Sequence, residues 1–304
     1  MSSNSNYPIV VFTYKRLRNF RVSINAIKNY EKISEKKIIF YSDGPKSEED
    51  LRQILKVRKF IKSIKGFKDI EYRFSDSNKG LACSFIEGIN EVLKCYESAL
   101  FLEDDNLISP FLFDFIDDYK EQVLNHPNVS CISGYSPKLF INKKRPFFFP
   151  GAESWSFFTW REAWNCFEIS NEKLINKLNN FYWKNLINDF LPYKKVVQDS
   201  KKNLNDSWSG RWGLSAFLDD RFILYPPKPL CINIGYEGSG TNSTSFSNIY
   251  NRKLSLDYIK NDLPNIPRNS YKVLPTIFSS KFAEIFDPYY LKYYGLKLIK
   301  NLSL

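Results

Sequence analysis

The chain has 304 residues, of which 43% are hydrophobic and 25% are charged. This composition is typical of a globular protein with a sizeable core, and it excludes a disordered chain. The net charge is +11, from 44 Lys and Arg against 33 Asp and Glu. Such a balance favours anionic partners, namely nucleotides, phospholipid surfaces or nucleic acid.

The cysteine and histidine content excludes several kinds of site. The five cysteines are odd in number and form no C-x-x-C pair: Cys83, Cys95, Cys131, Cys166 and Cys231. Without a secretory signal, we expect them to be reduced core thiols of a cytoplasmic protein. The single histidine, His126, argues against zinc enzymes with several His ligands and against a Ser-His-Asp triad. No run of eighteen apolar residues occurs, so we expect no membrane span.

The first 134 residues alternate between strand-like and helix-like patterns. The predicted strands are 8–13, 37–42, 70–74, 98–102 and 129–134, and the predicted helices are 17–30, 48–61, 84–96 and 110–124. Ser109 and Pro110 have the residue types of an N-cap and a first helical position. Such alternation predicts an α/β fold, with a mixed, mainly parallel sheet flanked by helices.

The second half of the chain is less regular. Residues 143–164 are rich in aromatic side chains and fit neither period, and a further helix is predicted over 171–191. The last sixty residues are basic. We find no internal repeat and no low-complexity linker.

Polar and charged residues follow several of the predicted strands. In parallel sheets ligands bind outside the carboxyl ends of the strands, which places Thr13–Arg16, Asp43 and Glu103–Asp105 along one edge. Three consecutive carboxylates without His or Cys suit a hard divalent cation, Mg²⁺ or Mn²⁺. They also suit an acidic flank at the start of the next helix. The residues alone leave both readings open.

Four segments occur in a distinctive order: "PIVVFTYKRLRNF", "IIFYSDGP", "NKGLACSFIEGINEVL" and "FLEDDNLISPFLFDFIDDY". Together they resemble glycosyltransferases of the GT-A (Rossmann-like) fold, most of all the branch of N-acetylglucosaminyltransferase I and related bacterial sugar transferases. The resemblance covers residues 7–137, is patchier to 243 and is absent beyond. It implies a GT-A domain over 1–245, with a nucleotide-binding half (1–137) and an acceptor half (138–245). A basic helical extension would follow over 246–304.

The resemblance also implies an activity. It predicts a metal-dependent, inverting glycosyltransferase that moves a sugar, N-acetylglucosamine or a related hexose, from a nucleoside-diphosphate donor. UDP would be the carrier, and the acceptor would be a glycan or a polyprenol-linked molecule of bacterial polysaccharide assembly. Asp105 would contact the metal, Mn²⁺ or Mg²⁺. Glu103 and Asp104 would bind the nucleotide-sugar or support Asp105.

The other donor-binding residues implied by the resemblance follow the first two strands. Asp43 in "YSDGP" would accept a hydrogen bond from a uracil-type base, and Arg16 would meet the base or the diphosphate. Thr13 ends the first strand and joins this set. From the residues alone, Asp-Gly-Pro is also an ordinary turn, and "KRLR" is also an ordinary solvated face.

Two later segments resemble the bacterial members. In "ESWSFFTWREAW", Trp155 and Trp160 would stack on sugar faces, although an aromatic core patch explains them equally well. Phe157–Phe158 stand where the pattern has small or Trp residues. In "GSGTNS", Asn242 replaces a His of the pattern, which implies weaker metal binding or a diphosphate held by the Gly238–Thr241 amides.

Inverting transfer needs a carboxylate that takes the proton of the acceptor hydroxyl. Asp206 in "LNDSWSGRW" fits best by position, and Asp199, Asp219, Asp220 and Glu153 remain possible. Asp206 also suits a simple helix cap.

Two other classes of function compete with this one. A sugar-nucleotide nucleotidyltransferase would share the sheet, but it needs a glycine-rich loop that "TYKRLRN" lacks. A nucleic-acid-binding protein would explain the charge, yet the basic residues are dispersed and no binding module is present, so we expect no nucleic acid. Residues 288–304 contain no acid and form an amphipathic pattern, which predicts either peripheral contact with the inner face of the cell membrane or a docked terminal helix.

Overall fold

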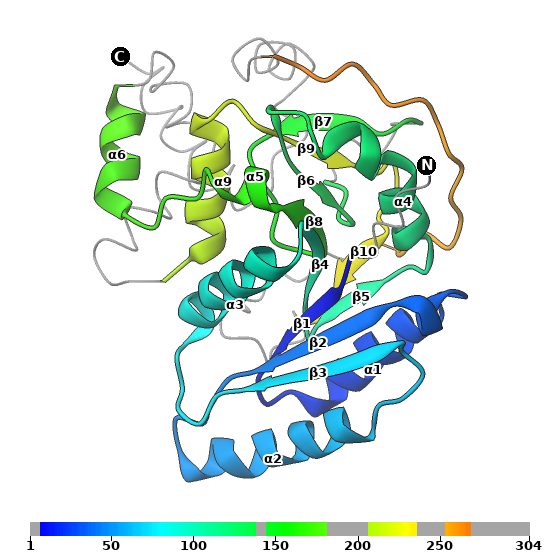
Figure 1. Cartoon of the computed structure of the whole chain (residues 1–304), viewed down its shortest axis with the longest axis vertical. Helices are drawn as coiled ribbons and strands as arrows, with labels where there is room; N and C mark the ends of the chain where they lie inside the picture. The colour runs from blue at the N-terminus through cyan, green and yellow to red at the C-terminus, as the bar shows by residue number, and fades with distance from the viewer. Residues whose placement is uncertain (1–6, 138–143, 181–205, 236–252, 269–304) are drawn as a thin grey trace, which may run out of the picture.

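The computed structural model describes residues 7–137, 144–180, 206–235 and 253–268, and all structural statements below concern these residues. Their centre is an eight-stranded sheet with the order β3-β2-β1-β4-β8-β6-β9-β7 (Figure 1). Its strands are β1 (Ile9–Thr13), β2 (Lys37–Ser42), β3 (Asp69–Phe74), β4 (Ser98–Glu103), β6 (Val129–Ser133), β7 (Phe147–Pro150), β8 (Phe157–Trp160) and β9 (Phe222–Tyr225). A separate two-stranded sheet pairs β5 (Asn106–Ile108) with β10 (Cys231–Asn233).

Most strands of the large sheet are parallel. β1 pairs in parallel with both β2 and β4, and β2 with β3. β8 lies antiparallel between β4 and β6, and β7 is antiparallel to β9. Because β4 and β6 are both antiparallel to β8, β6 runs in the same direction as β4. β9 is parallel to β6 and therefore shares this direction. The predicted mixed, mainly parallel sheet is therefore confirmed.

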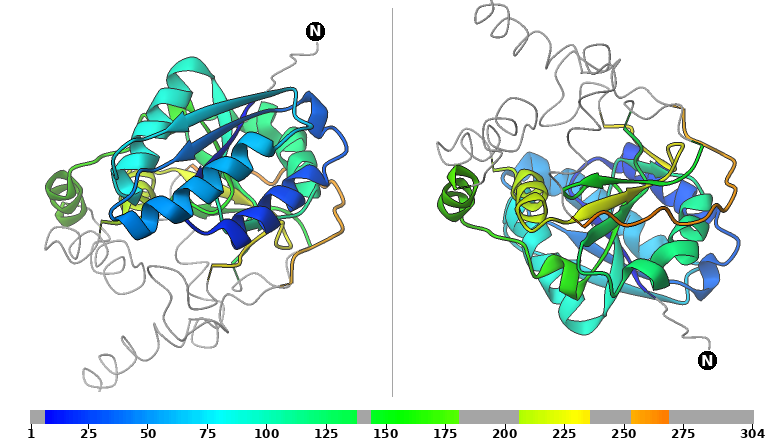
Figure 2. Two further views of the ribbon diagram at one scale, coloured as in Figure 1. Left: turned by 90° about the horizontal axis from the view of Figure 1, so that it is seen from below. Right: turned by 90° about the horizontal axis from the view of Figure 1, so that it is seen from above.

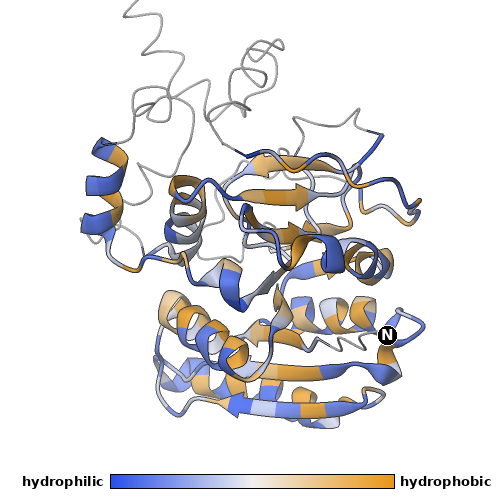
Figure 3. Ribbon diagram, turned by 45° about the horizontal axis from the view of Figure 1, so that its top comes forward, coloured by the Kyte–Doolittle hydropathy of each residue, from blue (hydrophilic) through white to orange (hydrophobic). Residues whose placement is uncertain are grey.

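Helices cover both faces of the sheet (Figures 1 and 3). They are α1 (Leu17–Lys28), α2 (Glu48–Ser63), α3 (Leu81–Cys95), α4 (Phe111–Val123), α5 (Arg161–Trp164), α6 (Asn171–Asn179) and α9 (Trp208–Leu218). Alternate β1 residues face opposite sides, so Val11 packs with the apolar stripes of α1, α2 and α4, whereas Phe12 packs with those of α3 and α9. Two cores result, and in Figure 3 the hydrophobic strands lie between helices whose outer faces are hydrophilic.

The predicted elements of the first half agree with the structure to within a few residues, and β2 agrees at both ends. Pro110 lies one position earlier than predicted, since it is the N-cap of α4, while the Ser109 hydroxyl accepts from the amide of Phe111. In the second half, α6 ends at Asn179 with Asn180 as its C-cap, and residues 181–191 of the predicted helix lie outside the described residues.

Residues 253–268, part of the region predicted as a helical extension, contain no helix. They form a strap that passes along α4 (Figure 2). Tyr258 donates to Asp118 at 2.7 Å, and the amide of Asn261 donates to the Tyr119 hydroxyl at 3.1 Å. The Tyr258 ring also packs edge-on against Phe115, so the strap covers part of the apolar surface of α4.

All five cysteines are unpaired. Cys131 and Cys231 are buried as expected, but Cys83 and Cys95 are exposed, so the prediction that all are core thiols is wrong for these two. Among the described residues, no helix is both long and apolar enough to cross a bilayer.

Candidate active site

The site lies where the strand order reverses. From β1 the chain continues to β2 and β3 on one side, and then returns to place β4 on the other side of β1. In open α/β sheets such a switch point leaves a crevice outside the carboxyl ends of the two strands. Thr13 ends β1 and is followed by Tyr14–Arg16, and Glu103 ends β4 and is followed by Asp104–Asp105. The topology therefore brings together the two segments that the sequence placed at one edge.

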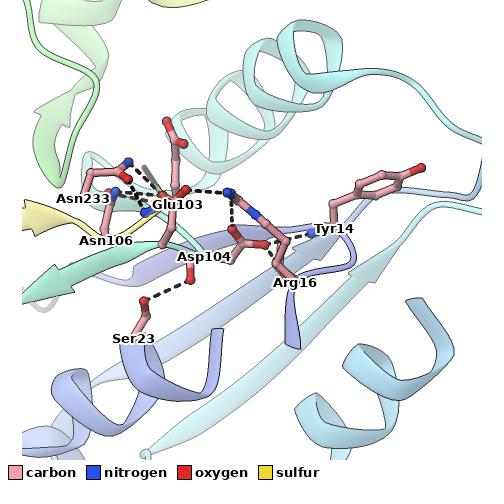
Figure 4. A network of polar contacts seen from close by, with 10 residues as sticks. Tyr14, Arg16, Ser23, Glu103, Asp104, Asn106 and Asn233 are labelled. Atoms are coloured by element: carbon pink, nitrogen blue, oxygen red, sulfur yellow. Dashed lines mark hydrogen bonds and ion pairs between the residues drawn. The ribbon is translucent and has the colours of Figure 1, made fainter. Parts of the chain in front are cut away.

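Arg16 connects these two segments (Figure 4). Its Nη2 lies 2.7 Å from Asp104 Oδ1 and 2.7 Å from Asp105 Oδ2. The two aspartate side chains are 4% and 5% exposed, whereas Arg16 is 27% exposed. Burial lowers the pKa of the Arg16 guanidinium, but the two carboxylates outweigh this effect and raise it above its usual value. One cation thus holds two buried, adjacent negative charges together.

Asp104 fixes the end of β1. Its Oδ2 accepts from the Thr13 hydroxyl at 3.0 Å and from the Tyr14 amide at 3.2 Å, and its backbone carbonyl accepts from Ser23 Oγ at 3.0 Å. Ser23 was not among the predicted site residues, although a small polar side chain between Phe20 and Ile24 on the buried face of α1 is a recognisable signal. Asp104 therefore positions the loop that carries Arg16.

Asp105 is held from the opposite side by the small sheet. Its Oδ1 accepts from Asn233 Nδ2 at 3.0 Å and from Asn106 Nδ2 at 3.4 Å, while its backbone carbonyl accepts from the Ile234 amide. Burial and the charge of Asp104 raise the pKa of Asp105, and Arg16 opposes this rise. Gly235 lies so close that a Cβ there would collide with Asp105 Oδ2. Sequence reasoning missed Asn233, because its position depends on the pairing of β5 with β10 across more than 120 residues.

Glu103 differs from the two aspartates because no donor in the described part of the chain binds its carboxylate. Its side chain points away from the Arg16 cluster in Figure 4. Burial, followed by the charges of Asp105 and Asp104, raises the pKa of Glu103 well above its usual value, and Glu153 adds to the rise. A carboxylate with unfilled acceptor positions beside a crevice is suited to bind hydroxyl groups of a ligand.

Asp43 has the opposite character. Its Oδ1 accepts from the amides of Gly44 and Lys79, and its Oδ2 accepts from Asn78 Nδ2 and the Gly80 amide, all within 3.0 Å. A carboxylate has about four acceptor positions, and these four donors take them. In this structure Asp43 joins the loop after β2 to the residues that precede α3. Its predicted contact with a base stays a prediction and requires that loop to rearrange.

The candidate catalytic bases lie at opposite edges of the large sheet. The Trp208 ring stacks on Phe85 with centroids 4.7 Å apart and lies 5.9 Å from Phe157, so α9 begins at the carboxyl edge. Asp206 precedes this helix, is 71% exposed and forms an ion pair with Arg211 at 2.9 Å. Asp219–Asp220 directly precede β9 and thus lie at the amino ends of the parallel strands, away from the crevice. Of the remaining predicted residues, Asp199, Asn242 and Gly238–Thr241 lie outside the described residues.

The predicted aromatic segment forms β8 and the residues before it. Trp160 is 1% exposed and belongs to the core, so its predicted stacking on sugar does not fit this structure. Trp155 is half-buried, and its ring packs edge-on against Tyr135 at 5.1 Å. Ser156 adopts a positive φ of 48°, and its amide donates to Asn106 Oδ1 at 3.1 Å, which anchors this segment beside the end of β4. Trp155 therefore remains on the crevice side.

The donor set allows a divalent cation shared with a substrate. Among the described residues, no group of three His, Cys, Asp or Glu side chains is arranged to hold a metal. Mg²⁺, however, is usually held by one or two carboxylates together with substrate phosphates. Asp105 Oδ2 accepts from Arg16 alone in the described part of the chain, so Asp105 fits a site of the shared kind.

Comparison with protein-family models and with curated proteins finds no match. Among solved structures, the chain is similar to S. aureus TarS with a TM-score of 0.41 and 13% identity, over 72% of this chain and 35% of that chain. It is similar to 4-diphosphocytidyl-2C-methyl-D-erythritol synthase from Anaerococcus prevotii (TM-score 0.37, 11% identity, 81% of this chain and 96% of that chain). It is also similar to galactosyltransferase LgtC in complex with donor and acceptor sugar analogues. That likeness has a TM-score of 0.35 and 10% identity, over 71% of this chain and 86% of that chain.

These likenesses are too distant to assign a function, and nothing in them links the chain to the N-acetylglucosaminyltransferase I branch.

Proposed function

We propose that this protein is a glycosyltransferase that uses a nucleotide-sugar bound at the β1/β4 crevice. The observation that supports it most is the arrangement at the switch point. A partly exposed cation, Arg16, is held by two buried aspartates, and beside it Glu103 has a carboxylate without donors in the described part of the chain. An anionic diphosphate matches Arg16, and sugar hydroxyls match Glu103, so the diphosphate and the sugar of a nucleotide-sugar both have partners.

In this proposal Arg16 binds the diphosphate and stabilises the negative charge that develops as the glycosidic bond breaks. Asp104 and Asp105 keep Arg16 charged and orient it. Glu103 accepts hydrogen bonds from the sugar and so fixes the anomeric carbon for attack. The carrier UDP and the sugar N-acetylglucosamine or a related hexose are the finer expectations, and they come from the sequence resemblance.

A divalent cation, Mn²⁺ or Mg²⁺, is part of the proposal. Asp105 would hold it together with the substrate phosphates. When bound, it would neutralise charge on the leaving diphosphate.

We assign proton acceptance from the acceptor hydroxyl to Asp206, which immediately precedes Ser207, the N-cap of α9, at the carboxyl edge of the sheet. Its ion pair with Arg211 orients the carboxylate, and its exposure leaves room for an acceptor. The acceptor, a glycan or a polyprenol-linked molecule, and membrane contact through residues 288–304 are expectations from the sequence, and that segment lies outside the described residues.

A nucleotidyltransferase remains the alternative class. The connection between β1 and α1 has three residues and no glycine, and the Tyr14 amide is already bound to Asp104. This loop is therefore poorly suited to wrap a triphosphate. Release of diphosphate from a nucleoside triphosphate and a sugar phosphate would favour the alternative.

The decisive test is a thermal-unfolding screen with UDP-, GDP-, CMP- and dTDP-sugars, each with and without Mn²⁺. A ligand at 100 times its Kd stabilises the folded protein by about 2.7 kcal/mol, which the melting temperature reports. We expect one nucleotide to stabilise the protein, and Mn²⁺ to increase the effect.

The control variants separate the site from general charge effects. Asp105→Asn should lose the Mn²⁺-dependent part of the stabilisation, whereas Asp262→Asn, an exposed acid on the strap, should keep it. If no nucleotide-sugar stabilises the wild-type protein, the proposed function is wrong.

A further inference from the structure

A second group of polar and aromatic side chains lies at the same edge of the sheet, on β6, β8 and β9. Its centre is Glu153, whose Oε1 accepts from the amides of Ser154 at 2.8 Å and Trp155 at 3.4 Å. Its Oε2 accepts from the Tyr225 hydroxyl at 2.9 Å. Tyr225 is the last residue of β9, so the pair lies at the carboxyl ends of the parallel strands.

Glu153 has acceptor capacity left. Three donors in the described part of the chain use three of about four acceptor positions, and the vacant one belongs to Oε2. This contrasts with Asp43, whose four positions are filled. Glu153 is half-buried, and burial raises its pKa above the usual value for a glutamate. A carboxylate fixed at one oxygen and open at the other is suited to read a ligand hydroxyl.

Two of the partners of this carboxylate are aromatic residues, since Tyr225 donates to it through its hydroxyl and Trp155 through its backbone amide. Tyr135 lies 5.1 Å from Trp155 and 6.4 Å from Tyr225, measured between ring centroids. Tyr135 and Trp155 are both half-buried. Sugars combine apolar C–H faces with hydroxyl groups, and an aromatic face beside a carboxylate matches both.

The position of the Glu153 group in the sheet indicates whether it would bind the donor sugar or the acceptor sugar. The nucleotide crevice uses β1 and β4, whereas Glu153, Tyr225 and Tyr135 lie beyond β4, next to β8, β9 and β6. Glu103 lies between the two groups, since it ends β4 and its charge interacts with that of Glu153. A ligand on Glu153 would therefore face the sugar end of a bound donor.

We propose that Glu153, positioned by Tyr225 and bordered by Tyr135 and Trp155, forms a subsite that binds a neutral pyranose of the acceptor. The assignment of the bound sugar to the acceptor rests on the proposed function, but the subsite itself is a property of these four residues. Glu153 is a specificity-determining residue here, and it accepts a hydrogen bond from one acceptor hydroxyl.

The test uses methyl β-D-glucopyranoside, methyl β-D-galactopyranoside and methyl N-acetyl-β-D-glucosaminide as probes. Their binding to the full chain is measured by saturation-transfer NMR, with and without UDP. We expect the wild type to bind at least one glycoside. Glu153→Gln should raise its Kd about tenfold, because a neutral amide replaces a charge-assisted hydrogen bond. Glu162→Gln, a change of the same type at an exposed position of α5, should leave it unchanged.

Further readouts keep the inference distinct from folding and from the donor site. Tyr225→Phe removes the hydroxyl that holds Oε2 but keeps the ring, and it should also weaken glycoside binding. This variant tests the subsite even where Glu153→Gln does not fold. UDP-dependent thermal stabilisation should be unchanged in both variants. Glycoside binding that is absent in the wild type, or equal in wild type and variants, overturns the subsite.

Loss of UDP stabilisation in folded Glu153→Gln overturns its assignment to the acceptor. Conversely, Glu153-dependent glycoside binding without any nucleotide binding supports the subsite and contradicts the proposed function.

Discussion

Replacing Arg16 with glutamine would leave two buried, adjacent carboxylates without their cation. The Asp104 and Asp105 side chains are 4% and 5% exposed, and both lie 2.7 Å from Arg16 Nη2. Removing one partner of a buried ion pair costs roughly 3–5 kcal/mol of the free energy of unfolding. Because Arg16 itself is 27% exposed, solvent screens part of this, and we expect a loss of about 2–3 kcal/mol at pH 7.5.

The loss should depend on pH with a defined sign. Burial and Asp104 raise the pKa of Asp105 in the folded protein above its usual value, and Arg16 opposes the rise. In Arg16→Gln the folded-state pKa rises further. Between the unfolded-state pKa of Asp105 and its raised folded-state pKa, the folded protein binds more protons than the unfolded protein does. The free energy of unfolding of the variant therefore falls as the pH rises through this range. The deficit of Arg16→Gln should therefore be smaller at pH 5 than at pH 7.5.

The assay is urea denaturation of wild type and variant at both pH values. Arg18→Gln removes the same charge from an exposed position of α1 and should change the free energy of unfolding by less than about 0.5 kcal/mol. An Arg16→Gln variant as stable as Arg18→Gln at pH 7.5 would refute the reasoning. A deficit that is equal at both pH values would refute the role of the carboxylate charges.

Three further changes test the site. Thr13→Val keeps the shape of the side chain but removes the hydroxyl bound to Asp104, and urea denaturation should show a loss of about 1–2 kcal/mol; equal stability would contradict that bond. Gly235→Ala places a methyl group against Asp105 Oδ2, so calorimetry should show at least about tenfold weaker binding of the nucleotide-sugar, and unchanged binding would separate Gly235 from the site. Asp206→Asn should lower turnover by roughly 10²–10⁴-fold with donor affinity unchanged, and a loss of donor binding with normal turnover would contradict its role as base.

Local patterns in the sequence were sufficient for the first half of the fold. The β2 block "KIIFYS" and the apolar spacing of α1 depend on neighbouring residues, and both were predicted to within two residues. The second half depends on pairing between distant segments. β8 enters the sheet antiparallel between β4 and β6, and no local signal in its four residues specifies these partners. For the same reason the sequence left Trp160 open between a sugar platform and a core residue, and β8 places it in the core.

The residues of the site were partly predictable in the same way. The acids at the end of β4 and the polar loop after β1 were predicted to share an edge, because parallel strands end together. That Arg16 binds both Asp104 and Asp105 was not predicted, since a basic run gives no information on which cation turns inward. Asn233 was missed because only the pairing of β10 with β5 brings it to Asp105.

The hydrogen-bond capacity of the carboxylates at this edge separates residues that build the site from residues that can bind a ligand. Asp43 and Asp104 accept from protein donors on both oxygens, and such groups gain little from a ligand unless they first release a partner. Glu103 and Glu153 keep acceptor positions that no described donor fills, and both have raised pKa values because burial penalises their charge. A ligand hydroxyl that donates to such a carboxylate offsets part of that penalty. Ligand binding at this edge should therefore depend more steeply on Glu103 and Glu153 than on Asp43, although all three lie at the carboxyl ends of the same sheet.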